Sequence, residues 1–180
     1  KTVLIAAKLR LGGAQRVTTA NDVGIWAATD SILDMLLREG DSIPSVTPPV
    51  NVRTIYMPQR VPGSSEAVRY GEGGRIFPKV QLSDGSIAIL SVKPGAAPTV
   101  VARTGTDDEE GRRLFTLGYA DFVDQDADDQ ACFVARWKPG IGGVTTANDS
   151  AIVLKSGSGT SVLVREGDDA DLGLDPIPHF

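Results

Sequence analysis

Val17-Thr18-Thr19-Ala20-Asn21-Asp22 recurs 127 residues later as Val144-Thr145-Thr146-Ala147-Asn148-Asp149, and Arg38-Glu39-Gly40-Asp41 recurs at the same offset as Arg165-Glu166-Gly167-Asp168. Between residues 17–41 and 144–168, 13 of 25 positions are identical without a gap. Such self-similarity at a fixed distance is the signature of a repeat architecture. A third copy is expected at about half of this offset, between the other two, and a shorter version of the repeat is found there at Val100–Gly105. The 180 residues are therefore predicted to form one domain, 1–180, of three units near 1–45, 46–107 and 108–180.

Short apolar runs dominate every unit. They span four to six residues, are rich in Val, Ile, Leu and Phe, and are bounded by Gly, Pro, Asn and Asp, which is typical of β-strands. We expect strands near 2–9, 23–29 and 33–38 in the first unit and near 131–137, 151–155 and 161–165 in the third. In the middle unit we align Ile87–Ser91 with Val3–Ala7, which predicts that a turn at 93–98 replaces a whole strand.

About three four-stranded repeats predict an all-β, β-propeller-like fold in which each unit is one blade. A blade buries its faces against its neighbours, so an unclosed stack leaves two faces exposed. Because propellers typically have about 4–8 blades, three units are too few. Two solutions stay open: two copies close a six-bladed ring as a homodimer, or the units pack as a small sandwich or an open solenoid.

Three features of the chain occur together in one known family. They are an apolar-Ala-apolar strand, the stretch Asn-Asp-x-Gly-Ile-Trp at 21–26, and the strand end Leu-Leu-Arg-Glu-Gly-Asp at 36–41. Residues 83–89 and, more loosely, 128–133 match the opening element, and 101–105 match the closing one. The chain resembles the tandem NxxGxxAF repeats of secreted or surface-anchored proteins of environmental bacteria over nearly its whole length, apart from 45–75. The resemblance implies an extracellular, propeller-like protein and brings no established catalytic residues.

Composition excludes several function classes. Eighteen Lys and Arg against 23 Asp and Glu give a net charge of −5, without a basic cluster larger than short pairs, so no nucleic-acid partner is expected. The single cysteine, Cys132, excludes an intrachain disulfide and a Cys-based zinc site. The single histidine, His179, argues against mechanisms that need two imidazoles. The sequence has no run of 18 apolar residues, so no membrane span is expected.

Two sets of oxygen ligands are candidate calcium sites. Asp124, Asp126 and Asp128 stand at alternate positions, where a tight loop can turn several carboxylates toward one ion; the alternative is a solvated acidic loop. The repeated pairs Asn21-Asp22 and Asn148-Asp149 resemble the axial Asn and Asp ligands of six-bladed hydrolytic propellers, the lactonases and phosphotriesterase-like enzymes. A cation held there would activate water without any histidine. The alternative is that these residues form turns through side-chain hydrogen bonds to the backbone.

Three functions follow from these observations. The leading hypothesis is a secreted, non-catalytic β-repeat module that binds a partner or assembles, with a homodimer as the expected assembly. The alternative is a calcium-dependent hydrolase of phosphotriesterase or lactonase type, with its site at the axis of an assembled propeller, so whether the chain is an enzyme stays open. A third possibility is a small-molecule or glycan ligand that stacks on Trp26 or Trp137.

Overall fold

The computed structural model describes residues 3–13, 16–28, 32–56, 74–122, 130–157 and 159–168. These residues form an all-β structure without a helix, as the sequence predicts. The strands are β1 (Val3–Lys8), β2 (Val23–Ala28), β3 (Leu33–Arg38), β4 (Ser42–Ile43), β5 (Val50–Tyr56), β6 (Lys79–Leu82), β7 (Ile87–Ser91), β8 (Thr99–Arg103), β9 (Leu114–Phe122), β10 (Ala131–Trp137), β11 (Ser150–Ser156) and β12 (Gly159–Arg165).

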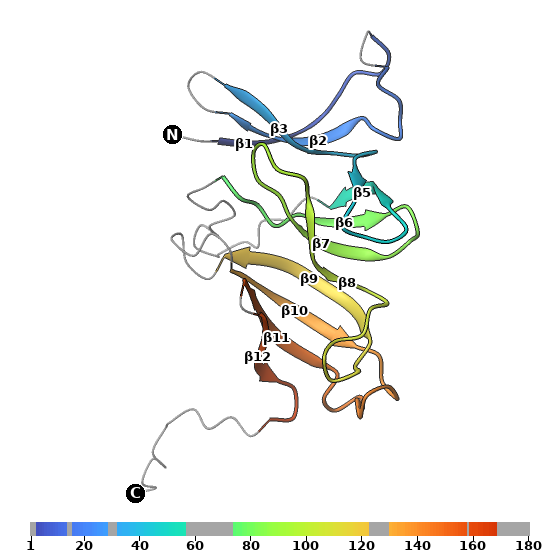
Figure 1. Ribbon diagram of the computed structural model, residues 1–180, viewed down its shortest axis with the longest axis vertical. Helices are drawn as coiled ribbons and strands as arrows, with labels where there is room; N and C mark the ends of the chain where they lie inside the picture. The colour runs from blue at the N-terminus through green and yellow to red at the C-terminus, as the bar shows by residue number, and fades with distance from the viewer. Residues whose placement is uncertain are drawn as a thin grey trace, which may run out of the picture.

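Three antiparallel sheets follow one another along the chain and stack along the long axis of the molecule (Figure 1). The first sheet has the order β1-β2-β3, the middle sheet β4-β5-β6-β7-β8, and the third sheet β12-β11-β10-β9. The sheets in the described residues thus have three, five and four strands, where the sequence predicted four in each unit. In the first sheet β1 is an edge strand, whereas its sequence counterpart β10 lies inside the third sheet, between β9 and β11.

The core lies in two layers between the three sheets. The first layer joins Ile25 and Leu37 of the first sheet to Val80, Ala88 and Leu90 of the middle sheet. The second layer is made by residues of the middle sheet, including Ile89 and Ala102, and of the third sheet, including Phe133, Trp137 and Val153. Consecutive residues of β7 therefore point into different layers, and Ala88, Ile89 and Leu90 are all fully buried. The middle sheet is covered on both faces.

One cross-strand register is common to all three sheets. The strand that ends in the repeated arginine pairs with the strand before it through Gly24 and Arg38, Ala88 and Arg103, or Ala151 and Arg165. One residue further along, each pair of strands is interrupted by a register shift of the β-bulge kind. The repeats seen in the sequence are thus repeats of backbone geometry.

This register corrects the expected alignment of the middle unit. Since Ile87–Ser91 pairs directly with the strand that ends at Arg103, it is the counterpart of β2 and β11, and the counterpart of β1 is β6. No strand is replaced by a turn: residues 92–98 connect β7 to β8 as a hairpin. The alignment was wrong because β6 has only four residues, Lys79–Leu82, and follows Pro78, so its apolar pattern is short.

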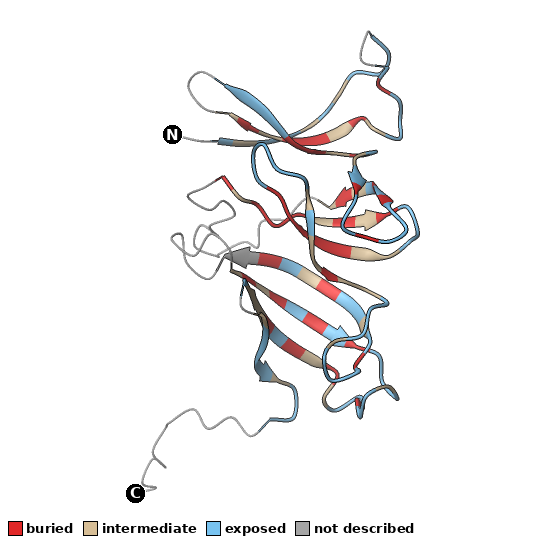
Figure 2. Cartoon of the chain, viewed as in Figure 1, coloured by how far each residue is buried: buried red, intermediate tan, exposed pale blue. Residues whose placement is uncertain are grey.

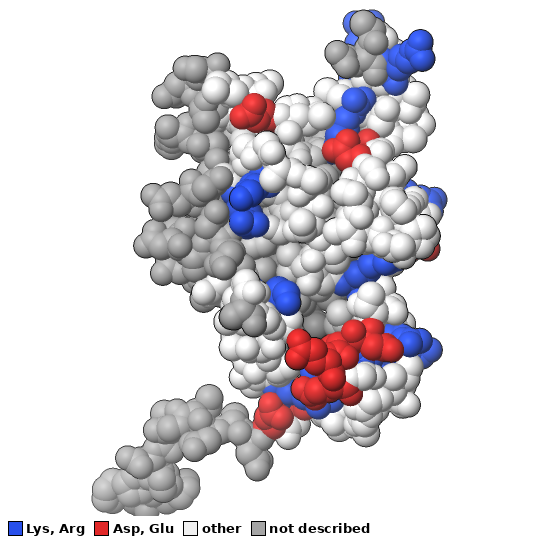
Figure 3. Space-filling model, in the orientation of Figure 1, with Lys and Arg blue, Asp and Glu red and all other residues white. Residues whose placement is uncertain are grey.

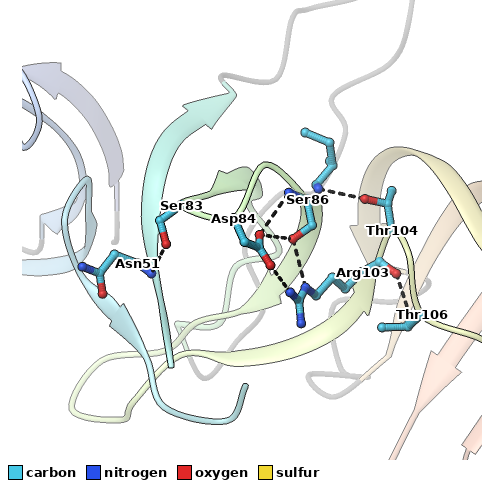
Figure 4. A network of polar contacts seen from close by, with 8 residues as sticks. Asn51, Ser83, Asp84, Ser86, Arg103, Thr104 and Thr106 are labelled. Atoms are coloured by element: carbon cyan, nitrogen blue, oxygen red, sulfur yellow. Dashed lines mark hydrogen bonds and ion pairs between the residues drawn. The ribbon is translucent and has the colours of Figure 1, made fainter. Parts of the chain in front are cut away.

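The repeated arginine closes each unit by reaching back to the turn that precedes its partner strand. Arg38 Nε donates to the carbonyl oxygen of Asn21 at 2.6 Å, and Arg165 Nε donates to that of Asn148 at 2.7 Å. In the middle sheet Arg103 donates to Ser86 Oγ at 2.9 Å and pairs with the carboxylate of Asp84 (Figure 4). The arginine therefore links two loops at one end of each sheet, which is a structural role.

Candidate functional site

The repeated asparagines are turn formers. The Thr18 and Thr145 backbone N–H groups each donate to the Oδ1 of the asparagine three residues later, Asn21 or Asn148, at 2.7 Å. The main-chain oxygens of both asparagines accept from the repeated arginines. Both asparagines therefore hold local structure, the alternative that the sequence left open.

The neighbouring aspartates form ion pairs inside their own sheets. Asp22, which is 3% exposed, lies 3.3 Å from Nζ of Lys8. Asp149, which is 4% exposed, accepts from the Arg136 guanidinium at 2.9 Å. A buried carboxylate needs such a partner because desolvation of an unpaired charge is costly. Each aspartate is committed to the cation on the adjacent strand.

The structure does not bring the candidate calcium ligands together. Asn21 and Asp22 precede β2 in the first sheet, Asn148 and Asp149 precede β11 in the third, and the middle sheet lies between them (Figure 1). Within the described part of the chain, no three His, Cys, Asp or Glu side chains are grouped as metal ligands would be. Asp124, Asp126 and Asp128 lie outside the described residues, so calcium binding there stays a prediction.

A cavity of about 740 Å³ opens between the middle and third sheets beside the loop 106–112. Trp137 lines it, and the Arg112 guanidinium lies 4.5 Å from the centre of the Trp137 ring. Arg112 in turn pairs with Asp108 and Glu110, both at 2.8 Å. Burial alone would raise the pKa of Asp108, but the hydrogen bonds and charge of Arg112 hold it below the ordinary value.

The acidic residues around this cavity outnumber the basic ones, and most of them are paired with an arginine. Arg113 pairs with Asp107 at 2.7 Å, and its hydrogen bond lowers the pKa of that carboxyl. Figure 3 shows acidic and basic side chains gathered side by side in the lower part of the molecule, while most of the described surface on this side carries no charge. The loop is stabilised by these pairs, and its four carboxylates, those of Asp107, Asp108, Glu109 and Glu110, outnumber the arginines Arg112 and Arg113 that pair with them. This side of the cavity is therefore acidic.

The two end sheets expose apolar side chains to solvent. On the outer side of the first sheet, Ile5, Trp26 and Met35 form one cross-strand row and Val3, Ala28 and Leu33 form the next; we name these six residues the head face. On the outer side of the third sheet, Val134, Ile152 and Val164 form a row beside Cys132 and Leu154; we name these five the tail face. Figure 2 shows that the outer strands β1 and β12 carry few buried residues, in contrast to β7.

Exposure on these faces is large for apolar residues. On the head face Val3, Leu33 and Met35 are 53%, 63% and 51% exposed, and on the tail face Val134, Ile152 and Val164 are 46%, 40% and 44% exposed. Trp26 belongs to the head face, where its ring covers Gly24: a Cβ at that glycine would lie 2.7 Å from the indole. Contiguous exposed apolar surface is typical of interaction sites.

Sequence reasoning predicted two exposed faces for an unclosed stack but did not name their residues. A signal for them was present: Ala151-Ile152-Val153-Leu154 and Val3-Leu4-Ile5-Ala6-Ala7 are apolar at every position. A strand that faces water on one side alternates between apolar and polar residues, whereas a continuous apolar run indicates that both faces are covered. These runs belong to strands whose outer side is bare.

Comparison of the chain with protein-family models, with curated proteins and with solved structures gave no match. The resemblance to the NxxGxxAF repeats therefore stays an expectation. Among the described residues, no helix has the length and apolar character needed to cross a membrane. The geometry of the chain itself, above all its two apolar end faces, is what indicates a function.

Proposed function

We propose that this protein is a propeller-like β-repeat module whose role is assembly, and that its head and tail faces are its docking surfaces. The observation that carries the proposal is the contrast between the middle sheet, covered on both faces, and the end sheets, each covered on one. Both end faces expose large apolar side chains, such as Leu33 on the head face and Val134 on the tail face. Contact of such apolar surface with water is unfavourable by about 25 cal/mol per Å². A complex in which a partner covers these faces is therefore stabilised.

The proposal includes the architecture expected from the sequence, in which three blade-like sheets are completed to six when two copies meet. It also places the module outside the cell or at its surface, as the resemblance to secreted bacterial repeats implies. A self-assembling β-repeat needs neither nucleic acid nor membrane, and none of its docking residues carries a charge.

Metal-dependent hydrolysis is not part of this proposal. The described candidates for that chemistry, Asn21, Asp22, Asn148 and Asp149, are used in turns and ion pairs in two separate sheets. A glycan that stacks on Trp137 is not proposed either, because that ring is 2% exposed and lies under Arg112.

Light scattering coupled to size exclusion tests the proposal over a hundredfold range of protein concentration. We expect a species of twice the chain mass of 18.9 kDa at the upper end of the range. A hydrophobic dye such as anilinonaphthalene sulfonate should bind the dilute protein and lose fluorescence per chain as the larger species forms. A mass of 18.9 kDa at every concentration, with no dye binding, would contradict an assembly role.

A further inference from the structure

The repeat register identifies the same position in each sheet. The cross-strand pair next to the arginine pair is Ile25 with Leu37 in the first sheet, Ile89 with Ala102 in the middle sheet and Ile152 with Val164 in the third. An isoleucine therefore occupies this position in all three sheets. In the first two sheets it points into a core layer and is 8% and 0% exposed, whereas in the third it is 40% exposed.

These equivalents give every sheet a direction. Ile25 and Leu37 pack toward the middle sheet, and their equivalents Ile89 and Ala102 pack toward the third. The tail face, with Ile152 and Val164, is thus the same side of the repeat as two sides that the chain already covers. In the first and middle sheets, this side packs against the sheet that follows in the chain.

The opposite sides of the sheets are equivalent to one another in the same way. Leu90 and Val153 follow the equivalent isoleucines, and they pack back onto the preceding sheet in the first and second core layers. Their equivalent in the first sheet is Trp26 of the head face. The head face is therefore the side that, in the other two sheets, receives the preceding sheet.

We propose that the tail face of one copy binds the head face of a second copy, so that the contact between copies repeats the contact between sheets. This inference rests on the proposed assembly role and specifies the partner and the pairing. The interface is head-to-tail, with two different surfaces in contact, and not a twofold contact of one surface with itself. Two such contacts, each head on tail, close the two-copy ring.

A charged group at the rim of the tail face is compatible with this contact. Arg136 stands beside Val134 and is paired with Asp149. Its register equivalent in the first sheet is Lys8, which is paired with Asp22 beside the first core layer. The chain thus already covers an equivalent side next to an equivalent ion pair, so Arg136 keeps its partner when the tail face is covered.

Two single substitutions test the pairing. Met35→Glu places a negative charge on the head face, and Ile152→Lys places a positive charge on the tail face; both sites are exposed in the single chain, so both variants should keep the fold. Leu11→Glu is the matched control, because Leu11 is 52% exposed but lies outside the sheets. Circular dichroism melts of the dilute proteins check that the three variants fold alike.

In a head-to-tail assembly every contact uses one head and one tail, so each face variant alone should lose self-association. We expect the dissociation constant to rise about a hundredfold or more, as it does when an unpaired charge must be buried. The mixture should then recover association: the intact tail of Met35→Glu binds the intact head of Ile152→Lys, and the second contact of the ring brings the two introduced charges, which are of opposite sign, together. Native mass spectrometry should show a 1:1 heterodimer, and Leu11→Glu should behave as the wild type.

The other outcomes separate the two proposals. If one face variant still assembles as the wild type does and the mixture forms no 1:1 heterodimer, the interface joins like faces; the head-to-tail inference is then wrong and the assembly role stands. If both face variants assemble like Leu11→Glu, neither face is used, and both proposals fail. A wild type that stays monomeric overturns both as well.

Discussion

The three equivalent isoleucines allow a matched test of the stack. Ile→Ala removes three carbon groups, worth about 2.4 kcal/mol at about 0.8 kcal/mol per group. At Ile89, which is fully buried in the middle sheet, the cavity adds to this loss, so we expect a decrease of about 3–4 kcal/mol in the free energy of unfolding. Ile25, nearly as buried, should lose about 3 kcal/mol.

Ile152→Ala is chemically the same substitution in a different environment. Because 40% of it is exposed in the single chain and water fills the space that is left, Ile152→Ala should cost only about 1 kcal/mol in dilute protein. At concentrations where the tail face is covered, the cost should rise toward that of Ile89→Ala, since the assembled state contributes to apparent stability by mass action.

Urea unfolding followed by Trp fluorescence, repeated at low and high protein concentration, measures all three differences. Ile→Val at the same three positions is the control, with a smaller expected loss of about 0.5–1.5 kcal/mol at the buried sites. The reasoning is refuted if Ile152→Ala costs as much as Ile89→Ala in dilute protein, because the tail face would then be covered within the single chain. Equal, small costs at all three positions would refute the core layers themselves.

Three further predictions test the repeat turns and their ion pairs. Gly167→Ala should cost clearly more than Gly85→Ala in thermal melts, because both glycines have positive φ but only a Cβ at Gly167 would lie 2.8 Å from a backbone oxygen; equal costs would contradict this turn geometry. Asn148→Ala should lose about 1 kcal/mol, since the Thr145 N–H loses its acceptor, whereas Asn148→Asp keeps the oxygen and should lose less in the same melts. Burial alone would raise the pKa of Asp84, but Ser86 and Arg103 lower it below its ordinary value of 3.8, so the stability it contributes is present above that pH and lost as pH falls through the lower folded value. The stability gap between wild type and Asp84→Asn should therefore narrow between about pH 6 and pH 2 in urea titrations, and a gap constant with pH would disprove this linkage.

The sequence alone predicts the all-β class because turn residues and short apolar runs are local signals. Residues 131–137 were predicted as a strand and form β10 with the same bounds. The repeated Arg-Glu-Gly-Asp was expected at a strand end, and β3 and β12 end at Arg38 and Arg165. These features depend on neighbours in the chain, which is why they can be read from it.

Features set by distant contacts were not predicted. β7 pairs with β6, a strand of four residues that follows a proline. The apolar pattern of β6 is too short to place this strand from the sequence. The Arg112 guanidinium stacks on the ring of Trp137, which is 25 positions further along the chain. Arg112 lies in a loop and Trp137 at the end of β10, and the two meet only after folding. Likewise, the sequence shows that Ile152 is apolar, but only the stack shows which of three equivalent isoleucines is left exposed.

The proposed head-to-tail pairing also constrains the size of the assembly. Each step from sheet to sheet uses the same two sides, so a contact of the same kind between copies continues the same rotation, and growth stops only when the last tail meets the first head. The number of sheets in a closed ring must then be a multiple of three. Between about four and eight blades, the range of known propellers, six is the only such multiple, and it corresponds to two chains. A mass that settles at two chains and stays there as concentration rises fits this closure, whereas a mass that keeps growing shows that the rotation does not close and that the same faces build a filament.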